Sequence, residues 1–143
     1  KSNMTGIVIC GKDENNTGYV LEDITLRGQP DEWARAAIAA YHRWQADRIV
    51  AEANQGGEMV AYTLHTIDEN VPVDLIHASR DKYLRADPVS ALYTQGRIKH
   101  VGSFPDLEDQ MCSWLAGDES PDRLDAMVHG ITALALLNDW TMA

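Results

Sequence analysis

Apolar residues recur along the chain with two different spacings, and this pattern predicts the order of strands and helices. Short runs rich in β-branched residues predict strands, and apolar residues that repeat every three to four positions predict amphipathic helices. The expected strands cover residues 4–12, 17–26, 47–52, 71–78 and 97–102. The expected helices begin near residues 30, 54, 80, 105 and 121. The first two strands form a hairpin, later strands alternate with helices, and two helices end the chain.

The segment that begins at Pro30 has the strongest helical pattern. Asp31 and Glu32 follow it in the first turn, where acidic side chains stabilise a helix N-terminus. The expected apolar stripe of this helix consists of Trp33, Ala37, Ala40, Tyr41 and Trp44. The last helix has equivalent signals, with Ser120 as the expected N-cap and Pro121 at the first helical position.

Strands that alternate with helices predict an α/β fold, in which a partly parallel sheet is covered by helices on both faces. The 143 residues suffice for a substantial core, so we expect a single domain spanning residues 1–143. No apolar run approaches the ~18 residues that cross a membrane, and the N-terminus lacks the apolar stretch of a signal peptide. Cys10 and Cys112 lie far apart without metal-ligand spacing, which favours a reduced, intracellular setting.

The chain carries a formal net charge of −10, from 12 basic and 22 acidic side chains. This balance argues against a general nucleic-acid-binding protein, because neutralising phosphates requires Lys and Arg gathered on one face. It does not exclude an enzyme that uses metal ions against phosphates. Such a site is built from carboxylates, and the bound metal reverses the local charge.

Glu52 follows the apolar residues Ile49, Val50 and Ala51 at the end of an expected strand. In a partly parallel sheet, ligands and catalytic groups gather at the carboxyl ends of the strands. Two interpretations are open from this position alone. Glu52 contributes to a catalytic site, or it caps the next helix or faces water, as most carboxylates do.

Asp122 and Asp125 stand three residues apart at the start of the last helix, so they project from neighbouring points of one face. Both acids also suit the helix dipole, which is the simpler explanation for Asp122. Asp125 precedes apolar residues and is expected at the edge of the buried stripe, which favours a ligand role. Together with Glu52 these acids have the composition of a site for Mg²⁺ or Mn²⁺. Two such ions can activate a water and stabilise a leaving oxygen in phosphodiester cleavage.

Arg80, Lys82 and Arg85 lie close together after an expected core strand. One interpretation is a solvated helix start. The other is contact with DNA phosphates, which would offset the acidic total locally.

Four segments carry a family resemblance: "DEWARAAIAAYHRWQADRIVAEANQGGEMV", "ASRDKYLRADPVSALYTQGRIKHVG", "FPDLEDQM" and "SPDRLDAMVHG". In order and spacing they closely resemble the C-terminal nuclease domain of phage large terminase subunits. The resemblance implies an RNase H-like mixed sheet flanked by helices on both faces, related to Holliday-junction resolvases and retroviral integrases. It also implies a metal-dependent endonuclease that cuts concatemeric viral double-stranded DNA during genome packaging.

The resemblance assigns roles to particular residues. Glu52 matches the acid at the end of the family's fourth strand, and Asp122 and Asp125 match the acids of its final helix, with Asp125 the preferred ligand. These three would hold two Mg²⁺ or Mn²⁺ ions, and Lys82, aided by Arg80 and Arg85, would contact DNA. The implied partners are double-stranded DNA, the terminase ATPase domain, the small terminase subunit and the portal protein. The implied location is the host-cell cytoplasm, for a phage- or prophage-encoded protein without a membrane partner.

One departure from the family concerns its first strand, which carries an aspartate. The chain begins at Lys1, after the position of that strand, and Asp13 and Asp23 are poor substitutes. Without this strand the sheet would lack its central member, and we would expect weak metal binding and little cleavage. No GxxxxGK[ST] motif occurs, so ATP hydrolysis is not expected. The alternatives are a catalytically inactive nuclease-fold module that docks to the packaging motor or portal, and, third, a resolvase.

Overall fold

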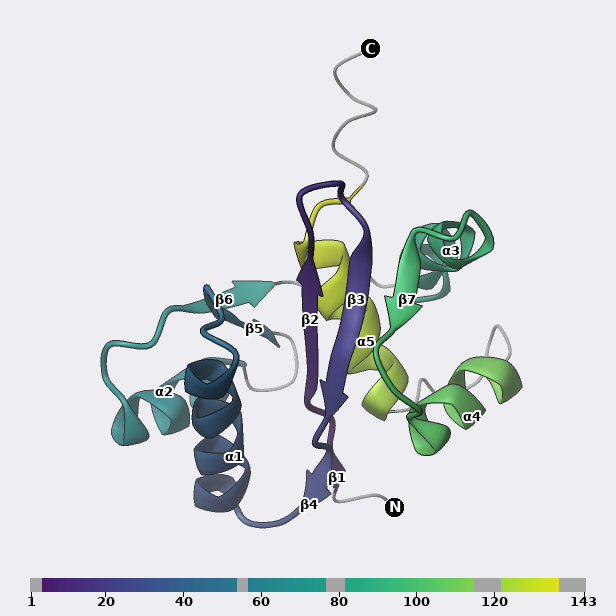
Figure 1. Cartoon of the computed structure of the whole chain (residues 1–143). Coiled ribbons are helices and arrows are strands. Elements are labelled where there is room, and N and C mark those ends of the chain that lie inside the picture. The colour runs from purple at the N-terminus through teal and green to yellow at the C-terminus, as the bar shows by residue number, and fades with distance from the viewer. Residues whose placement is uncertain (1–3, 54–56, 77–81, 115–121, 137–143) are drawn as a thin grey trace. The chain divides into compact units, whose positions relative to one another are not determined.

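The computed structural model describes residues 4–53, 57–76, 82–114 and 122–136, with the backbone alone for residues 57 and 82–86. These ranges contain five helices and seven short strands (Figure 1). The strands are β1 (Met4–Thr5), β2 (Val8–Lys12), β3 (Gly18–Asp23), β4 (Leu26–Arg27), β5 (Ile49–Glu52), β6 (Val73–Ile76) and β7 (Ile98–His100). The helices are α1 (Pro30–Arg43), α2 (Gly57–Ile67), α3 (Lys82–Thr94), α4 (Pro105–Ser113) and α5 (Asp122–Ala133). The predicted α/β class and order of elements are confirmed.

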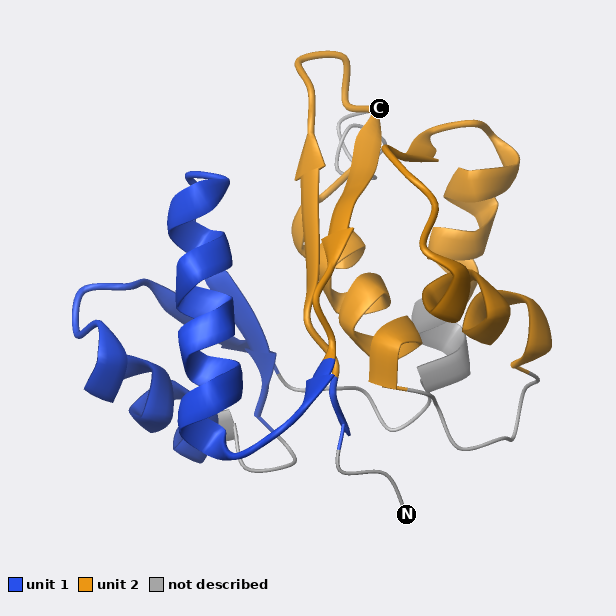
Figure 2. Ribbon diagram, turned by 60° about the horizontal axis from the view of Figure 1, so that its bottom comes forward, with its two compact units in different colours: residues 1–5, 26–80 blue, residues 6–25, 81–143 orange. Residues whose placement is uncertain are grey.

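The chain divides into two compact units, which Figure 2 colours separately. Unit 1 consists of Lys1–Thr5 and Leu26–Arg80, and unit 2 consists of Gly6–Thr25 and Asp81–Ala143. Each unit buries a hydrophobic cluster of its own. The expectation of one domain over residues 1–143 stays a prediction. No helix in the described ranges is long and apolar enough to cross a membrane.

In unit 1, helices α1 and α2 pack beside the parallel pair β5–β6. Ile49 pairs with Val73 and Glu52 with Ile76 in this ladder. The buried cluster consists of Ala34, Ile38, Leu64 and Val71, with Trp33, Ala37 and Tyr41 packed against it. The expected apolar stripe of α1 is therefore largely confirmed. The prediction that Trp44 belongs to this stripe is wrong. The helix ends at Arg43, and Trp44 is its C-cap residue with 41% of its surface exposed.

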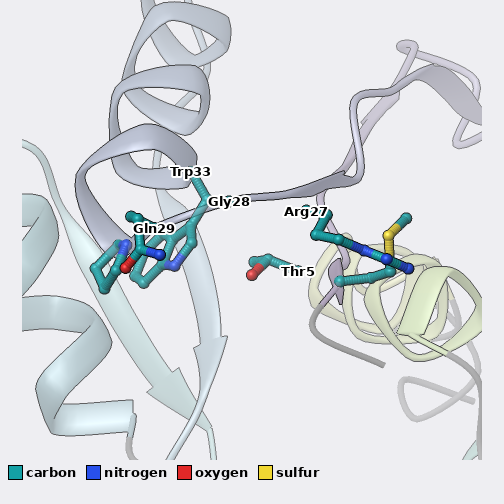
Figure 3. A pocket seen from close by; sticks show the side chains of 7 residues that line it. Thr5, Arg27, Gly28, Gln29 and Trp33 are labelled. Carbon is teal, nitrogen blue, oxygen red and sulfur yellow. The ribbon is translucent and has the colours of Figure 1, made fainter. Parts of the chain in front are cut away.

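Unit 1 also contains an open pocket of about 530 Å³ between the β1–β4 pair and the start of α1. Figure 3 shows Thr5 between Arg27 on one side and Gln29 and Trp33 on the other. Among the residues that the structure describes, those that line this pocket include no predicted site residue.

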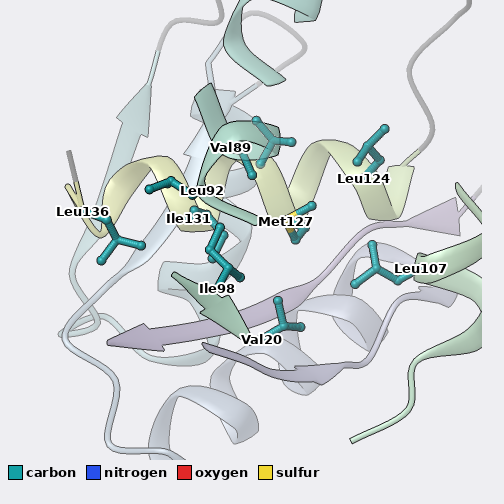
Figure 4. Close-up of a cluster of buried hydrophobic side chains, with 10 residues drawn as sticks. Val20, Val89, Leu92, Ile98, Leu107, Leu124, Met127, Ile131 and Leu136 are labelled. Carbon is teal, nitrogen blue, oxygen red and sulfur yellow. The ribbon is translucent and has the colours of Figure 1, made fainter. Parts of the chain in front are cut away.

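In unit 2, helix α5 packs against the β2–β3 hairpin, and β7 joins the free side of β3 in parallel (Figure 1). The predicted hairpin is thus confirmed, and β7 lies within the strand predicted over residues 97–102. Figure 4 shows the core, where residues of α5 meet β3, β7, α3 and α4. Its fully buried members include Val20, Leu107, Met127, Ile131 and Leu136.

The predictions of single strands over residues 4–12 and 17–26 are wrong, because each segment is divided between two sheets. Strands β1 and β2 belong to different sheets and are separated by Gly6 and Ile7. Gly6 lies against the start of α5, and a Cβ atom at this position would overlap the carbonyl oxygen of Asp122. This close approach requires glycine, and it depends on a helix that lies more than a hundred residues away in the sequence.

Candidate metal and DNA-binding site

Glu52 is the last residue of β5, at the carboxyl end of a parallel pair. The ladder continues one residue further, since the Ala53 amide donates to the Ile76 carbonyl oxygen at 2.7 Å. The Glu52 side chain is half-buried. The predicted position at a strand end is therefore confirmed, and the predicted ligand role stays a prediction.

Asp122 and Asp125 both lie in the first turn of α5 and are half-buried. Leu124 and Met127, their neighbours along the helix, are buried in the core of unit 2. The expected place of Asp125 at the edge of the buried stripe is confirmed. The expected cap and first-turn residues Ser120 and Pro121 lie outside the described residues.

Arg123, between the two aspartates in the sequence, pairs with acids of other elements. Its Nε donates to Oδ2 of Asp23 at 3.0 Å, and its Nη2 lies 3.6 Å from Oδ2 of Asp106 on α4. The other Asp23 oxygen accepts from the Thr25 amide at 3.1 Å. Asp23 thus stabilises the fold through an ion pair.

Asp13 has a similar structural role in the hairpin turn. Its carboxylate accepts from the amides of Asn15 and Thr17, both at 2.9 Å, and from the Tyr19 hydroxyl at 3.0 Å. The hydrogen bond from the Thr17 amide is the main cause that lowers the pKa of Asp13. These contacts agree with the expectation that Asp13 is a poor substitute for the family's first-strand aspartate.

The donor set fits a hard cation in its chemistry, because Mg²⁺ and Mn²⁺ prefer carboxylate oxygens. Asp122 and Asp125 offer two carboxylates one helical turn apart. Glu52 belongs to unit 1 and the two aspartates to unit 2. Within the part of the chain that the structure describes, no three acidic, histidine or cysteine side chains are grouped to hold a metal ion.

Two of the three predicted DNA-binding residues, Lys82 and Arg85, belong to α3. Arg80 falls outside the described residues. Helix α3 begins at Lys82 and includes Arg85, and the structure describes only the backbone of both. Their contact with DNA stays a prediction.

Sequence reasoning missed a polar chain inside unit 2. His100 contacts Oε2 of Glu108 through Nδ1 at 2.9 Å and the Tyr93 hydroxyl through Nε2 at 2.7 Å. The hydrogen bond with His100 is the main cause that lowers the pKa of Glu108, and burial raises the pKa of Tyr93. These hydrogen-bonded side chains link α3, β7 and α4. No spacing in the sequence predicts these hydrogen bonds, because their geometry depends on how the three elements pack.

Comparison with known proteins gives one family. The sequence model of the terminase RNaseH-like domain matches residues 1–134. No match was found among curated proteins or among solved structures.

Proposed function

Because the chain belongs to the family of terminase RNaseH-like domains, we propose that it is a metal-dependent endonuclease that cuts concatemeric viral double-stranded DNA during genome packaging. The fold is RNase H-like, and the family is of the nuclease type, with DNA and the packaging machinery as its general partners. The observation that carries the proposal is the match over residues 1–134, nearly the whole chain.

In the proposed site, Glu52, Asp122 and Asp125 hold two Mg²⁺ or Mn²⁺ ions, with Asp125 as the principal ligand on α5. The carboxyl-end position of Glu52 and the shared helical turn of the two aspartates support this assignment. When bound, such ions activate a water and stabilise the leaving oxygen of the cleaved phosphodiester. Glu52 would contribute a carboxylate at a strand end, and Asp122 and Asp125 would contribute carboxylates from one helical turn.

The proposed partners follow from the same function. Lys82, with Arg80 and Arg85, contacts phosphates of double-stranded DNA beside the carboxylates. The net charge of −10 opposes tight DNA binding by this chain alone. The terminase ATPase domain, the small terminase subunit and the portal protein would therefore deliver and hold the DNA, in the cytoplasm of the host cell.

Plasmid cleavage in Mn²⁺ tests the proposal. The variants Glu52→Ala, Asp122→Ala and Asp125→Ala are compared with the unchanged chain. We expect each to lose about 100-fold or more in rate, since metal ligation contributes several kcal/mol to transition-state stabilisation. Glu69→Ala and Asp109→Ala serve as matched controls, because both side chains are exposed acids outside the proposed site, and their rates should not change.

The outcomes separate the competing functions. Equal cleavage by the unchanged chain and all three variants would remove the site assignment. A folded chain that cleaves nothing but binds the ATPase domain or the portal protein would establish the inactive docking module instead. Preference for four-way junctions over linear duplex would identify a resolvase.

A further inference from the structure

Arg123 lies in the sequence between the two proposed ligands of α5. A positive charge so close to two carboxylates can oppose the binding of a metal cation. Consecutive helix residues point in different directions, so Arg123 does not share the face of Asp122 and Asp125. Its side chain is nevertheless long and flexible. A free guanidinium at this position could fold back onto either carboxylate and compete with a metal ion.

The structure holds the Arg123 guanidinium away from these carboxylates. It is paired with Asp23 at 3.0 Å, and the two side chains are only 16% and 9% exposed. Asp23 is itself fixed, because its second oxygen accepts from the Thr25 amide. A shielded ion pair of this kind resists opening, since separating it leaves an uncompensated charge in a poorly hydrated place.

Two further contacts restrain the same turn of α5. Oε1 of Gln110, on α4, accepts from the Leu124 amide at 3.1 Å and so satisfies one of the open N–H groups at the helix start. Gly6 lies directly against the Asp122 carbonyl group. The end of β3, helix α4 and the lead-in to β2 therefore all meet the first turn of α5.

We propose that the Arg123–Asp23 ion pair, together with the Gln110 cap, positions Asp122 and Asp125 for metal binding and keeps the Arg123 charge away from them. This inference rests on the proposed metal site. Arg123 and Asp23 are positioning residues, and neither contacts the metal. The pair explains how an arginine can follow Asp122 in the same turn while its charge is bound by Asp23.

The proposal predicts that a residue outside the ligand set controls metal affinity. Asp23→Asn releases the Arg123 charge, so Mn²⁺ binding should weaken by about 10-fold, the lower end of effects from groups that orient ligands. The double variant Asp23→Asn, Arg123→Gln removes the released charge as well. It should regain the part of the affinity that the released charge costs, although the ion pair itself stays broken, a coupling that independent sites do not show.

Isothermal titration calorimetry with Mn²⁺ measures these affinities, and thermal unfolding in EDTA establishes that each variant is folded at the titration temperature. Asp109→Asn, an exposed acid on α4, is the control and should bind like the unchanged chain. Unchanged affinity in Asp23→Asn would overturn the proposal. Absence of rescue in the double variant would overturn it too, because direct ligation by Asp23 or a general loss of fold gives that result.

The failures of the two proposals can be told apart. If Asp125→Ala binds Mn²⁺ as tightly as the unchanged chain, the proposed metal site fails. If Asp125→Ala loses binding while Asp23→Asn keeps it, the site stands and the positioning pair fails. Amide hydrogen exchange gives a readout without metal: Asp23→Asn should speed exchange at Leu124 more than at Ile131, and equal protection would contradict the pair.

If Asp23→Asn does not fold, Gln110→Ala examines the same turn with a smaller change. It removes only the acceptor of the Leu124 amide. Mn²⁺ binding should weaken severalfold in this variant, and exchange at Leu124 should accelerate. Affinity and exchange equal to those of the unchanged chain would again contradict the proposal.

Discussion

His100 shows how a single side chain joins several elements of unit 2. The carboxylate of Glu108 can only accept, so Nδ1 of His100 donates to it, and Nε2 faces the Tyr93 hydroxyl. The Tyr93 oxygen also lies 3.7 Å from the Met127 sulfur, which offers a second, weaker acceptor. The Phe104 amide donates to the same Glu108 oxygen at 3.2 Å. Glu108 is therefore stabilised in its charged form.

This arrangement predicts a specific dependence of stability on pH. The folded state lowers the pKa of Glu108 from its ordinary value of 4.5, mainly through the His100 hydrogen bond. Its contribution is therefore complete above pH 4.5 and is lost as pH falls through the lowered value. Glu108→Gln keeps an oxygen acceptor but does not titrate. Urea unfolding should show that this variant loses less stability on acidification than the unchanged chain.

The control for this measurement is Glu69→Gln, at an exposed position of unit 1. It should lose stability on acidification as steeply as the unchanged chain. The explanation fails if the Glu108→Gln profile runs parallel to that of the control below pH 4.5.

The packing of α5 on β2 depends on a glycine, Gly130, which has no side chain. A Cβ atom at Gly130 would come 2.8 Å from the Cys10 sulfur, closer than Cβ atoms approach non-bonded atoms in folded proteins. Burial raises the pKa of Cys10 to about 12, so the thiol stays neutral, and it packs against the core of unit 2. The helix that carries Asp122 and Asp125 can therefore lie this close to the strand only because residue 130 is glycine.

Gly130→Ala should destabilise unit 2 by about 1–3 kcal/mol, the usual cost of overfilling a packed interface. Adding Cys10→Ala removes the sulfur that the new methyl group meets, so the double variant should be more stable than Gly130→Ala alone. Chemical unfolding monitored by circular dichroism measures both. Gly102→Ala is the control, since its nearest neighbour would be the Phe104 ring at 3.9 Å. Equal destabilisation by Gly102→Ala and Gly130→Ala would contradict the close-packing argument.

The net charge of the chain limits how it can bind DNA. With a net charge of −10, any binding to phosphates must come from local groups of cations. Of the proposed ligands, Glu52 belongs to unit 1, and Asp122 and Asp125 belong to unit 2. Lys82, the first residue of α3, is the proposed DNA contact.

Lys82→Ala should weaken duplex binding and reduce the slope of log affinity against log salt by about 1, as expected for one lost phosphate contact. Fluorescence anisotropy with a labelled duplex over a series of salt concentrations measures the slope. Lys99→Ala, at an exposed position on β7, is the matched control and should leave the slope unchanged. Identical slopes for both variants would mean that Lys82 does not contact DNA.

Much of the fold follows from local patterns in the chain. The positions of α1, α4, the β2–β3 hairpin, β5 and β7 all agree with the predicted segments. Apolar periodicity predicts these elements because it shows which face of an element is buried. The period is three to four residues in a helix and two in a strand. The same reasoning correctly placed Glu52 at a strand end and Asp125 beside a buried helical stripe.

Apart from Trp44, where α1 ends earlier than the apolar stripe predicted, the exceptions depend on contacts between different elements. The break at Gly6 depends on the Asp122 carbonyl group, and Arg123 finds Asp23 across 100 positions. His100 acquires its partners only when α3, β7 and α4 pack together. Burial of one face of an element gives neighbouring residues a regular apolar spacing, so a buried face can be recognised from a short stretch of sequence. The partner of a polar side chain, or the space beside a glycine, is set by elements that meet after folding, and no local pattern encodes that meeting.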